Sequence, residues 1–152
     1  MGKILMVCLG NICRSPLAAG ILKSKTTHLD ILVDSAGTAA YHIGERPDVR
    51  SIEIANKYDI DLTSQRARQF SVNDFDEFDR IYAMDTSNYS NIISLARNEK
   101  DRDKVDLILN EINPRSFQSV PDPYYGGDNG FQDVYEMLDE ACDIIVQNFE
   151  KS

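Results

Sequence analysis

The stretch VCLGNICRSP, from Val7 to Pro16, places two cysteines on either side of a Gly-Asn turn and ends in Arg-Ser-Pro. The apolar run KILMV at residues 3–7 leads into it and is typical of a buried strand. Pro16 suits the first turn of a helix, and apolar residues with helical spacing follow it: Leu17, Ala18, Ile21 and Leu22. The stretch therefore predicts a tight loop between a buried strand and a helix.

The rest of the chain repeats this alternation of strand and helix. Strands are expected at 31–33, 80–83 and 105–109, and helices begin near Pro47 and after Asp85, whose carboxylate suits a helix cap. The final helix has the clearest period, with apolar residues three or four positions apart up to residue 149. The pattern predicts an α/β fold: a single three-layer domain over residues 1–152, with a four-stranded parallel sheet and helices on both faces.

Composition narrows the classes of protein that fit the chain. With 152 residues, 42% hydrophobic and 27% charged, it has the make-up of a globular domain. Three cysteines are an odd number, and no export signal or membrane-length apolar run is visible, so we expect a cytoplasmic location, a free thiol and no membrane insertion. A net charge of −9 disfavours nucleic acid as a partner. Short-range donors can still bind a phosphate, because salt screens distant charges over about 8–10 Å.

Cys8 falls at the carboxyl end of the first expected strand, the edge at which open parallel sheets bind ligands. Gly10 and Asn11 tolerate unusual backbone angles, so the loop can curl and present successive N–H groups to an anion at the start of the helix. Such a loop holds a phosphate-like dianion and favours the thiolate form of Cys8. Arg14 adds a planar fork for two phosphate oxygens, and Ser15 can donate to the sulfur. We therefore expect a phosphate-binding loop after the first strand.

The spacing Cys-(five residues)-Arg-Ser at a strand-to-helix turn is the cysteine phosphatase signature, and CLGNICRS resembles the low-molecular-weight protein tyrosine phosphatases. VPDPYYGG, at 120–127, matches the Asp-Pro-Tyr loop of that family, and the resemblance covers nearly the whole chain. It implies that Cys8 is the nucleophile and that Arg14 binds phosphate and stabilises the transition state. Asp122 is then the general acid, needed because a tyrosyl leaving group has a pKa of about 10, and afterwards the general base.

The same resemblance implies supporting roles for other residues. The expected phosphate-binding loop includes Leu9, Gly10, Asn11, Ile12, Cys13 and Ser15. Residues expected to support the loop or to line the groove for an aryl ring are Ser35, Tyr41, Tyr124 and Tyr125, with Leu9 as a further wall. The chain departs from many relatives in carrying Gln65 where they have a histidine. Either Gln65 substitutes as a neutral donor, or the network that supports the loop is rearranged.

The resemblance implies a two-step reaction that uses no metal and no other cofactor. A thiolate attacks phosphorus, and water then hydrolyses the cysteinyl-phosphate. The expected partners are phosphotyrosine-containing proteins, with inorganic phosphate as product and inhibitor, and the expected state is a monomer or weak dimer.

Other functions of the same fold remain as alternatives. Arsenate reductase relays a disulfide through extra cysteines, and none lies between Cys13 and Cys142. The arginine phosphatases of the family carry Thr where Ile12 stands; a branched apolar side chain crowds a guanidinium and suits a flat ring, which favours tyrosine. A phosphotyrosine-binding module with a dead site is disfavoured, because the nucleophile, the arginine and the acid are all present.

The remaining cysteines and histidines have separate interpretations. Cys13 is either a passive loop residue or a redox partner that forms a reversible disulfide with Cys8, and its place in the same loop favours the redox role. Cys142 lies on the apolar stripe of the last helix and is expected in the core. His28 and His42 lack a metal-binding spacing and are expected to be surface residues.

Overall fold

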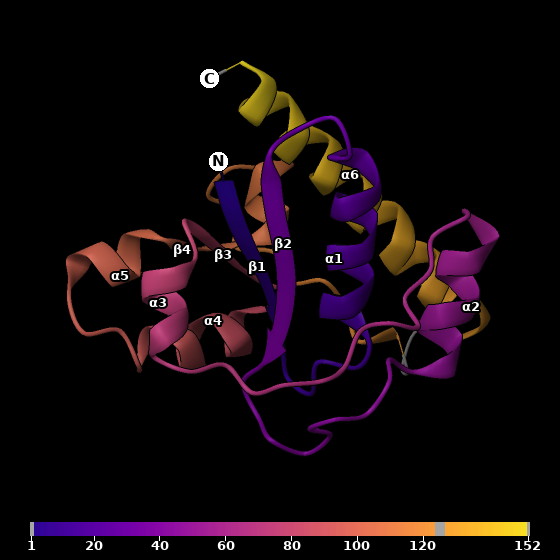
Figure 1. The fold of residues 1–152 in the computed structure, drawn as a ribbon, viewed down its shortest axis with the longest axis horizontal. Helices are drawn as coiled ribbons and strands as arrows, with labels where there is room; N and C mark the ends of the chain where they lie inside the picture. Colours follow the sequence, from indigo (N-terminus) through magenta and orange to yellow (C-terminus); the bar gives the residue numbers. More distant parts are fainter. Residues whose placement is uncertain (1, 124–126, 152) are drawn as a thin grey trace.

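Strand β1 (Gly2–Cys8) runs through the middle of the sheet in the computed structural model, which describes residues 2–123 and 127–151. It pairs with β2 (Ile31–Gly37) on one side and with β3 (Arg80–Ala83) on the other, and β4 (Val105–Leu107) pairs with β3. All pairs are parallel, and the strand order is β2-β1-β3-β4 (Figure 1). The carboxyl ends of the strands therefore share one edge of the sheet.

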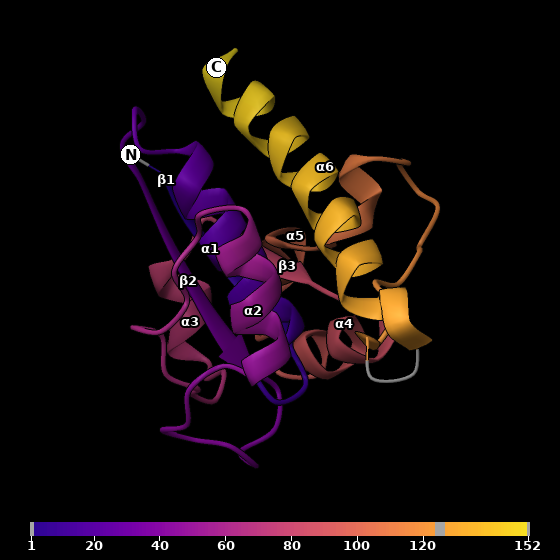
Figure 2. The ribbon, with the colours of Figure 1, turned by 90° about the vertical axis from the view of Figure 1, so that its right-hand side faces the viewer.

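Helices cover both faces of the sheet (Figures 1 and 2). One face carries α1 (Arg14–Lys25), α2 (Val49–Lys57) and α6 (Gly130–Glu150), and the other carries α3 (Asn73–Glu77) and α4 (Thr86–Ile93). Side chains of β1 alternate between the two faces: Ile4 and Met6 pack with α1 and α6, whereas Leu5 and Val7 pack with Phe75 of α3. Both faces of β1 are thus buried, as its continuous apolar sequence requires.

The predicted three-layer α/β architecture with a four-stranded parallel sheet is confirmed, and the differences lie at element boundaries. The fourth strand ends at Leu107 rather than at residue 109, because the chain turns there into a 3-10 helix (Ile108–Glu111). Two short helices, α3 and α5 (Glu99–Asp103), were not predicted, because five residues are too few to show a helical period. A further 3-10 helix covers Gly127–Asn129.

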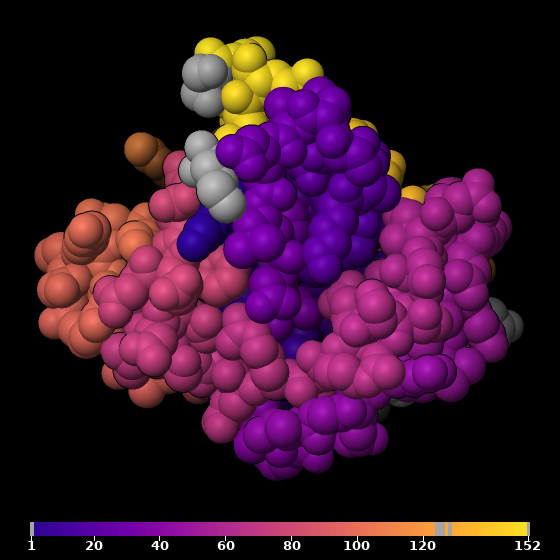
Figure 3. Space-filling model, viewed as in Figure 1, coloured from indigo at the N-terminus to yellow at the C-terminus, as the bar shows by residue number. Residues whose placement is uncertain are grey.

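The segment that follows β2 joins the loop after β1 at the carboxyl edge of the sheet. The backbone N–H of Thr38 donates to the carbonyl oxygen of Cys8 at 2.9 Å. Gly37 allows this close approach, because a Cβ atom there would lie only 2.7 Å from the carbonyl oxygen of Leu9. Residues 38–48 continue along the lower edge of the molecule in the view of Figure 3.

The described residues lack a membrane-spanning helix and a cluster of metal-ligating side chains. Within residues 2–123 and 127–151, no helix combines the length and apolar character needed to cross a lipid bilayer. The same residues contain no group of three or more His, Cys, Asp or Glu side chains placed to hold a metal ion.

Candidate active site

The sulfur of Cys8 lies at the carboxyl end of β1 and is almost fully buried, with 2% of the residue exposed. Its Sγ atom is 3.0 Å from Oγ of Ser15, the second residue of α1, which is fully buried. The first turn of α1 therefore sets a hydroxyl group beside the sulfur, close to the positive end of the helix dipole.

Asn11 holds the shape of the loop between β1 and α1. Its backbone is in the left-handed region, with a φ of 56°, and its side chain is buried. Its Nδ2 donates to Oγ of Ser15 and to Oγ of Ser35, both at 2.8 Å. Its Oδ1 accepts the backbone N–H of Arg68 at 3.0 Å. One asparagine thus joins the loop to α1, to β2 and to the segment around residue 68, as expected for Asn11, Ser15 and Ser35.

Within residues 9–13, Asn11 alone has a positive φ, so the loop does not use the freedom of Gly10 to take such angles. The requirement at Gly10 is steric: a Cβ atom there would lie 3.0 Å from Cδ2 of His42. The loop curls through the asparagine, and the glycine leaves room for the histidine ring.

Three backbone carbonyls of the loop accept hydrogen bonds from the segment after β2, and a fourth, that of Cys13, accepts one from within α1. The carbonyl oxygens of Cys8, Leu9, Ile12 and Cys13 accept hydrogen bonds from the backbone N–H groups of Thr38, Ala39, Asp48 and Leu17, respectively. In the part of the chain that the structure describes, the backbone N–H groups of residues 9–14 have no protein acceptor. In an anion-binding loop, successive N–H groups are left without a protein acceptor and can bind the anion. The six N–H groups of residues 9–14 fit this arrangement.

Arg14, the first residue of α1, is buried and held by two partners from other elements. Its Nη1 donates to Oδ2 of Asp85 at 2.8 Å and to the carbonyl oxygen of Val120 at 2.9 Å. Asp85 also caps α4 as predicted, since its Oδ1 accepts the N–H of Asn88. Within the described residues, Nε and Nη2 of Arg14 make no hydrogen bond, so two donors of the planar fork are left.

A cavity of about 140 Å³ opens beside these groups. Its lining residues are Cys8, Leu9, Gly10, Ile12, Cys13, Arg14, Tyr41, His42 and Asp122. The three residues expected to be catalytic therefore meet at one cavity, although Asp122 lies far from the other two in sequence. Tyr124 and Tyr125, which were expected near the groove, lie outside the described residues.

The segment before Asp122 is tied to the sheet. The N–H of Val120 donates to the carbonyl oxygen of Met84, directly after β3, at 2.7 Å. Beyond Asp122, the backbone of Pro123 approaches α6 so closely that a Cβ atom at Gly130 would lie 2.5 Å from its carbonyl oxygen. These contacts on either side bring the exposed Asp122 to the cavity.

His42 was predicted to be a surface residue, and the structure adds that it lines the cavity. The ring is half-buried, and its Nδ1 is 2.7 Å from Oε2 of Glu45. His28 is exposed, as predicted. No local sequence motif indicated this position for His42, because the loop that carries it reaches the site only through the arrangement of the sheet.

Cys13 and Cys142 are both buried. Burial, partly offset by a hydrogen bond from Ser51, raises the pKa of the Cys13 thiol to about 12, so this thiol is neutral at physiological pH. Cys142 lies in the core beneath α1, as predicted, and burial raises the pKa of its thiol as well. The redox role of Cys13 stays a prediction.

Gln65 bonds to β2 and to α1 behind the loop. Its Oε1 accepts the hydroxyl hydrogen of Ser35 at 3.1 Å, and its Nε2 donates to the carbonyl oxygen of Pro16 at 3.0 Å. Toward Ser35, Gln65 is therefore an acceptor and not the neutral donor of the first expectation, and its amide donates to the backbone of α1 instead.

The site has the features of a cysteine-dependent phosphatase. A cysteine ends a central parallel strand, a curled loop follows it, and an arginine begins the next helix.

Comparison with known proteins identifies the family within this class. Residues 3–152 match the family described as low molecular weight phosphotyrosine protein phosphatase. A Schizosaccharomyces pombe protein of that name is 41% identical over 155 residues, which cover 99% of this chain and 96% of that protein. The crystal structure of a protein tyrosine phosphatase from Entamoeba histolytica has a TM-score of 0.90 at 35% identity, covering 99% and 98% of the two chains. A Drosophila arginine phosphatase has a TM-score of 0.87 at 31% identity, with 97% of each chain covered. The chain belongs to the low molecular weight phosphotyrosine protein phosphatase family, which confirms the resemblance found in the sequence.

Proposed function

We propose that this chain, acting as one domain, hydrolyses phosphotyrosine in proteins through a cysteinyl-phosphate on Cys8. The observation that carries the proposal is the meeting of Cys8, Arg14 and Asp122 at one cavity. Family membership supports the reaction class, a metal-independent hydrolysis of a phosphate ester.

In the first step, the Cys8 thiolate attacks phosphorus and forms the sulfur–phosphorus bond while the bond from phosphorus to the aryl oxygen breaks. The departing oxygen takes its proton from the carboxyl group of Asp122. Nε and Nη2 of Arg14 and the N–H groups of residues 9–14 bind the three equatorial oxygens, where negative charge is greatest. Asp85 and the carbonyl of Val120 hold the arginine in place for this role.

In the second step, water attacks the phosphorus of the cysteinyl-phosphate and gives a proton to the Asp122 carboxylate. The sulfur–phosphorus bond breaks, inorganic phosphate leaves, and the sulfur regains its negative charge. Ser15 is placed to stabilise that charge: its oxygen accepts from Asn11 and its own hydrogen can point to Sγ at 3.0 Å.

Ile12 favours tyrosine over arginine as the phosphorylated residue. Ile12 and Tyr41 both line the cavity, so a flat ring finds apolar contacts there, whereas a guanidinium would lose hydration without gaining a polar partner from Ile12. The fold alone does not separate the two substrates, because the Drosophila arginine phosphatase shares it.

The direct test compares phosphotyrosine and phosphoarginine peptides with the purified chain, without added metal. We expect phosphotyrosine to be hydrolysed faster. Preferential hydrolysis of phosphoarginine would overturn the substrate assignment while leaving the cysteine chemistry in place.

A further inference from the structure

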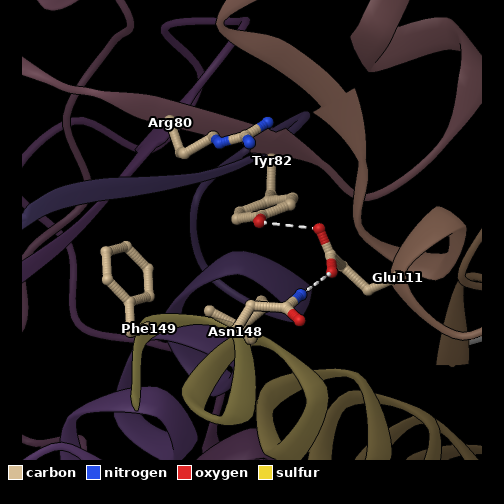
Figure 4. A pocket seen from close by; sticks show the side chains of 6 residues that line it. Arg80, Tyr82, Glu111, Asn148 and Phe149 are labelled. Atoms are coloured by element: carbon tan, nitrogen blue, oxygen red, sulfur yellow. Dashed lines mark hydrogen bonds between the residues drawn. The ribbon is translucent and has the colours of Figure 1, made fainter. Parts of the chain in front are cut away.

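A cavity of about 230 Å³ opens at the amino end of the sheet, where β3 begins and the last turns of α6 pass (Figure 4). None of its lining residues also lines the cavity around Cys8, so the two cavities are separate. The residues that line this amino-end cavity are Arg80, Tyr82, Glu111, Ile145, Asn148 and Phe149.

Glu111 brings a fixed negative charge to the amino-end cavity. The hydroxyl of Tyr82 donates to its Oε1 at 2.9 Å, and Nδ2 of Asn148 donates to its Oε2 at 3.0 Å. Both donors are neutral, so they orient the half-buried carboxylate without cancelling its charge. In the part of the chain that the structure describes, no ion pair joins Glu111 to a cation. Because a carboxylate oxygen can accept more than one hydrogen bond, Glu111 can still accept from a cationic donor.

Arg80 brings a positive charge to the same cavity. Within residues 2–123 and 127–151, its guanidinium forms no hydrogen bond and no ion pair, either with Glu111 or with another residue. Figure 4 shows Arg80 and Glu111 on different sides of Tyr82. The planar fork of N–H groups on a guanidinium matches the two oxygens of a carboxylate, so Arg80 can bind an anionic group.

The charges around the cavity favour a ligand that is neutral overall. An adjoining cavity of about 500 Å³ shares Arg80 and Phe149 with the amino-end cavity. It is also lined by Asp30 and Asp79. These two carboxylates and that of Glu111 repel a purely anionic ligand, and Arg80 repels a purely cationic one. A ligand that carries both charges a few atoms apart satisfies Arg80 and Glu111 together.

The two cavities also offer apolar contacts. Phe149, which lines both, is partly buried, and so are Leu29 and Ile31 of the adjoining cavity. Ile145 adds an apolar wall to the amino-end cavity. A large apolar group on the ligand therefore loses contact with water when it lies against these side chains, which favours binding.

We propose that the amino-end cavity binds a free α-amino acid with a large apolar side chain. The ammonium group donates to Glu111, and the carboxylate accepts from Arg80. The side chain lies against Phe149 and extends toward Leu29 and Ile31. This binding site is additional to the proposed function and lies at the other end of the sheet from Cys8.

The test titrates L-phenylalanine into the whole chain labelled with ¹⁵N and follows the amide chemical shifts. We expect saturable binding with a dissociation constant on the order of 1 mM, the affinity that a ligand of this size reaches. The largest shifts should occur at residues that line the two cavities, such as Gly2, Ile31 and Ile145. Phenethylamine lacks the carboxylate and phenylacetate lacks the ammonium group, so each should bind at least about tenfold more weakly.

Two variants assign each half of the ligand to its side chain. Arg80→Gln should weaken binding of L-phenylalanine about tenfold and leave that of phenethylamine unchanged, because phenethylamine has no carboxylate to lose. Glu111→Gln should weaken L-phenylalanine similarly and leave phenylacetate unchanged, and its amide oxygen can still accept from Tyr82. Arg102→Gln and Glu136→Gln, at exposed positions outside the two cavities, are the matched controls and should bind as wild type does.

Three results would overturn the proposal: no saturation by L-phenylalanine up to about 20 mM, equal affinity for all three probes, or shifts centred on residues 8–14. Hydrolysis of p-nitrophenyl phosphate by the Arg80 and Glu111 variants should equal that of wild type, which also shows that the variants are folded. An inactive wild type would refute the proposed function, and the binding measurement would still decide the present proposal.

Discussion

The two ends of the sheet each carry a cluster of hydrogen-bonded polar side chains beside a cavity, and only one has the make-up of a catalytic site. At the carboxyl end, Cys8 faces Ser15 and the N-terminus of α1. Toward the amino end, the hydroxyl of Tyr82 donates to Oε1 of Glu111 at 2.9 Å, and Asn148 donates to Oε2 at 3.0 Å (Figure 4).

The clusters differ in the sign of the charge that surrounds the acidic side chain of each, the Tyr82 hydroxyl in one and the Cys8 thiol in the other. Burial, together with the charge and hydrogen bond of Glu111, raises the pKa of the Tyr82 hydroxyl far above its usual value, so the oxygen stays neutral. Cys8 instead faces hydrogen-bond donors, and Arg14 lines the same cavity. Buried polar networks thus occur at both ends, and a surplus of donors around the nucleophile distinguishes the catalytic one.

The largest expected effect comes from removing the nucleophile. Cys8→Ser keeps the shape of the carboxyl-end cluster but replaces sulfur by a poorly ionised hydroxyl. Hydrolysis of p-nitrophenyl phosphate should fall by about 10⁴-fold or more, as with other covalent nucleophiles. Full activity in this variant would show that the carboxyl-end cluster is no more catalytic than the Tyr82 cluster.

Removing the acid should have a smaller effect that depends on the substrate. Asp122→Ala should slow phosphotyrosine hydrolysis by about 10²- to 10⁴-fold, the usual range for general acid–base catalysis. The loss of kcat/KM should be smaller with p-nitrophenyl phosphate, whose leaving group needs no proton. Equal losses of kcat/KM with the two substrates would argue against Asp122 as the acid.

Asp85→Asn separates the two roles of that residue. Asparagine is also a good helix cap, so α4 should keep its N-terminus, but the charged bond to Arg14 is lost. We expect kcat/KM to fall about tenfold and the free energy of unfolding to fall by about 1–3 kcal/mol, because the buried Arg14 loses one charge-assisted hydrogen bond. Urea denaturation and steady-state kinetics on the same preparation measure both quantities, and unchanged kinetics would contradict the role of this pair.

The smallest effect on activity is expected at the amino end. Tyr82→Phe should lower the free energy of unfolding by about 1 kcal/mol, because Glu111 loses one of its two partners. The kcat and KM of the folded protein should not change. A tenfold loss of kcat in this variant would mean that the amino-end cluster takes part in the reaction and that the comparison drawn above is mistaken.

The sequence predicted what is local and periodic. The strand, loop and helix around Cys8 are contiguous, so these elements could be predicted from local patterns, whereas the roles of their residues came from the family resemblance; the helix at the end of the chain followed from its period. The cap role of Asp85 was found because helix caps are local.

Contacts between distant segments were not predictable in this way. Arg14 and Asp85 are 71 residues apart, and the Arg14 contact with Val120 spans 106 residues. The orientation of Gln65 depends on a backbone carbonyl of α1, which no residue pattern reveals. His42 reaches the cavity through a loop without regular structure. The predictions for Tyr124 and Tyr125 remain untested.

The central claim is that the Cys8 sulfur carries the phosphoryl group during the reaction. Asp122→Ala mixed rapidly with p-nitrophenyl phosphate should release a burst of p-nitrophenolate and then stall, because water activation in the second step is impaired. Mass spectrometry of the protein denatured during the burst should find one phosphoryl group on the peptide that contains Cys8. A phosphoryl group on another residue, or its absence from the protein during a clear burst, would contradict the account.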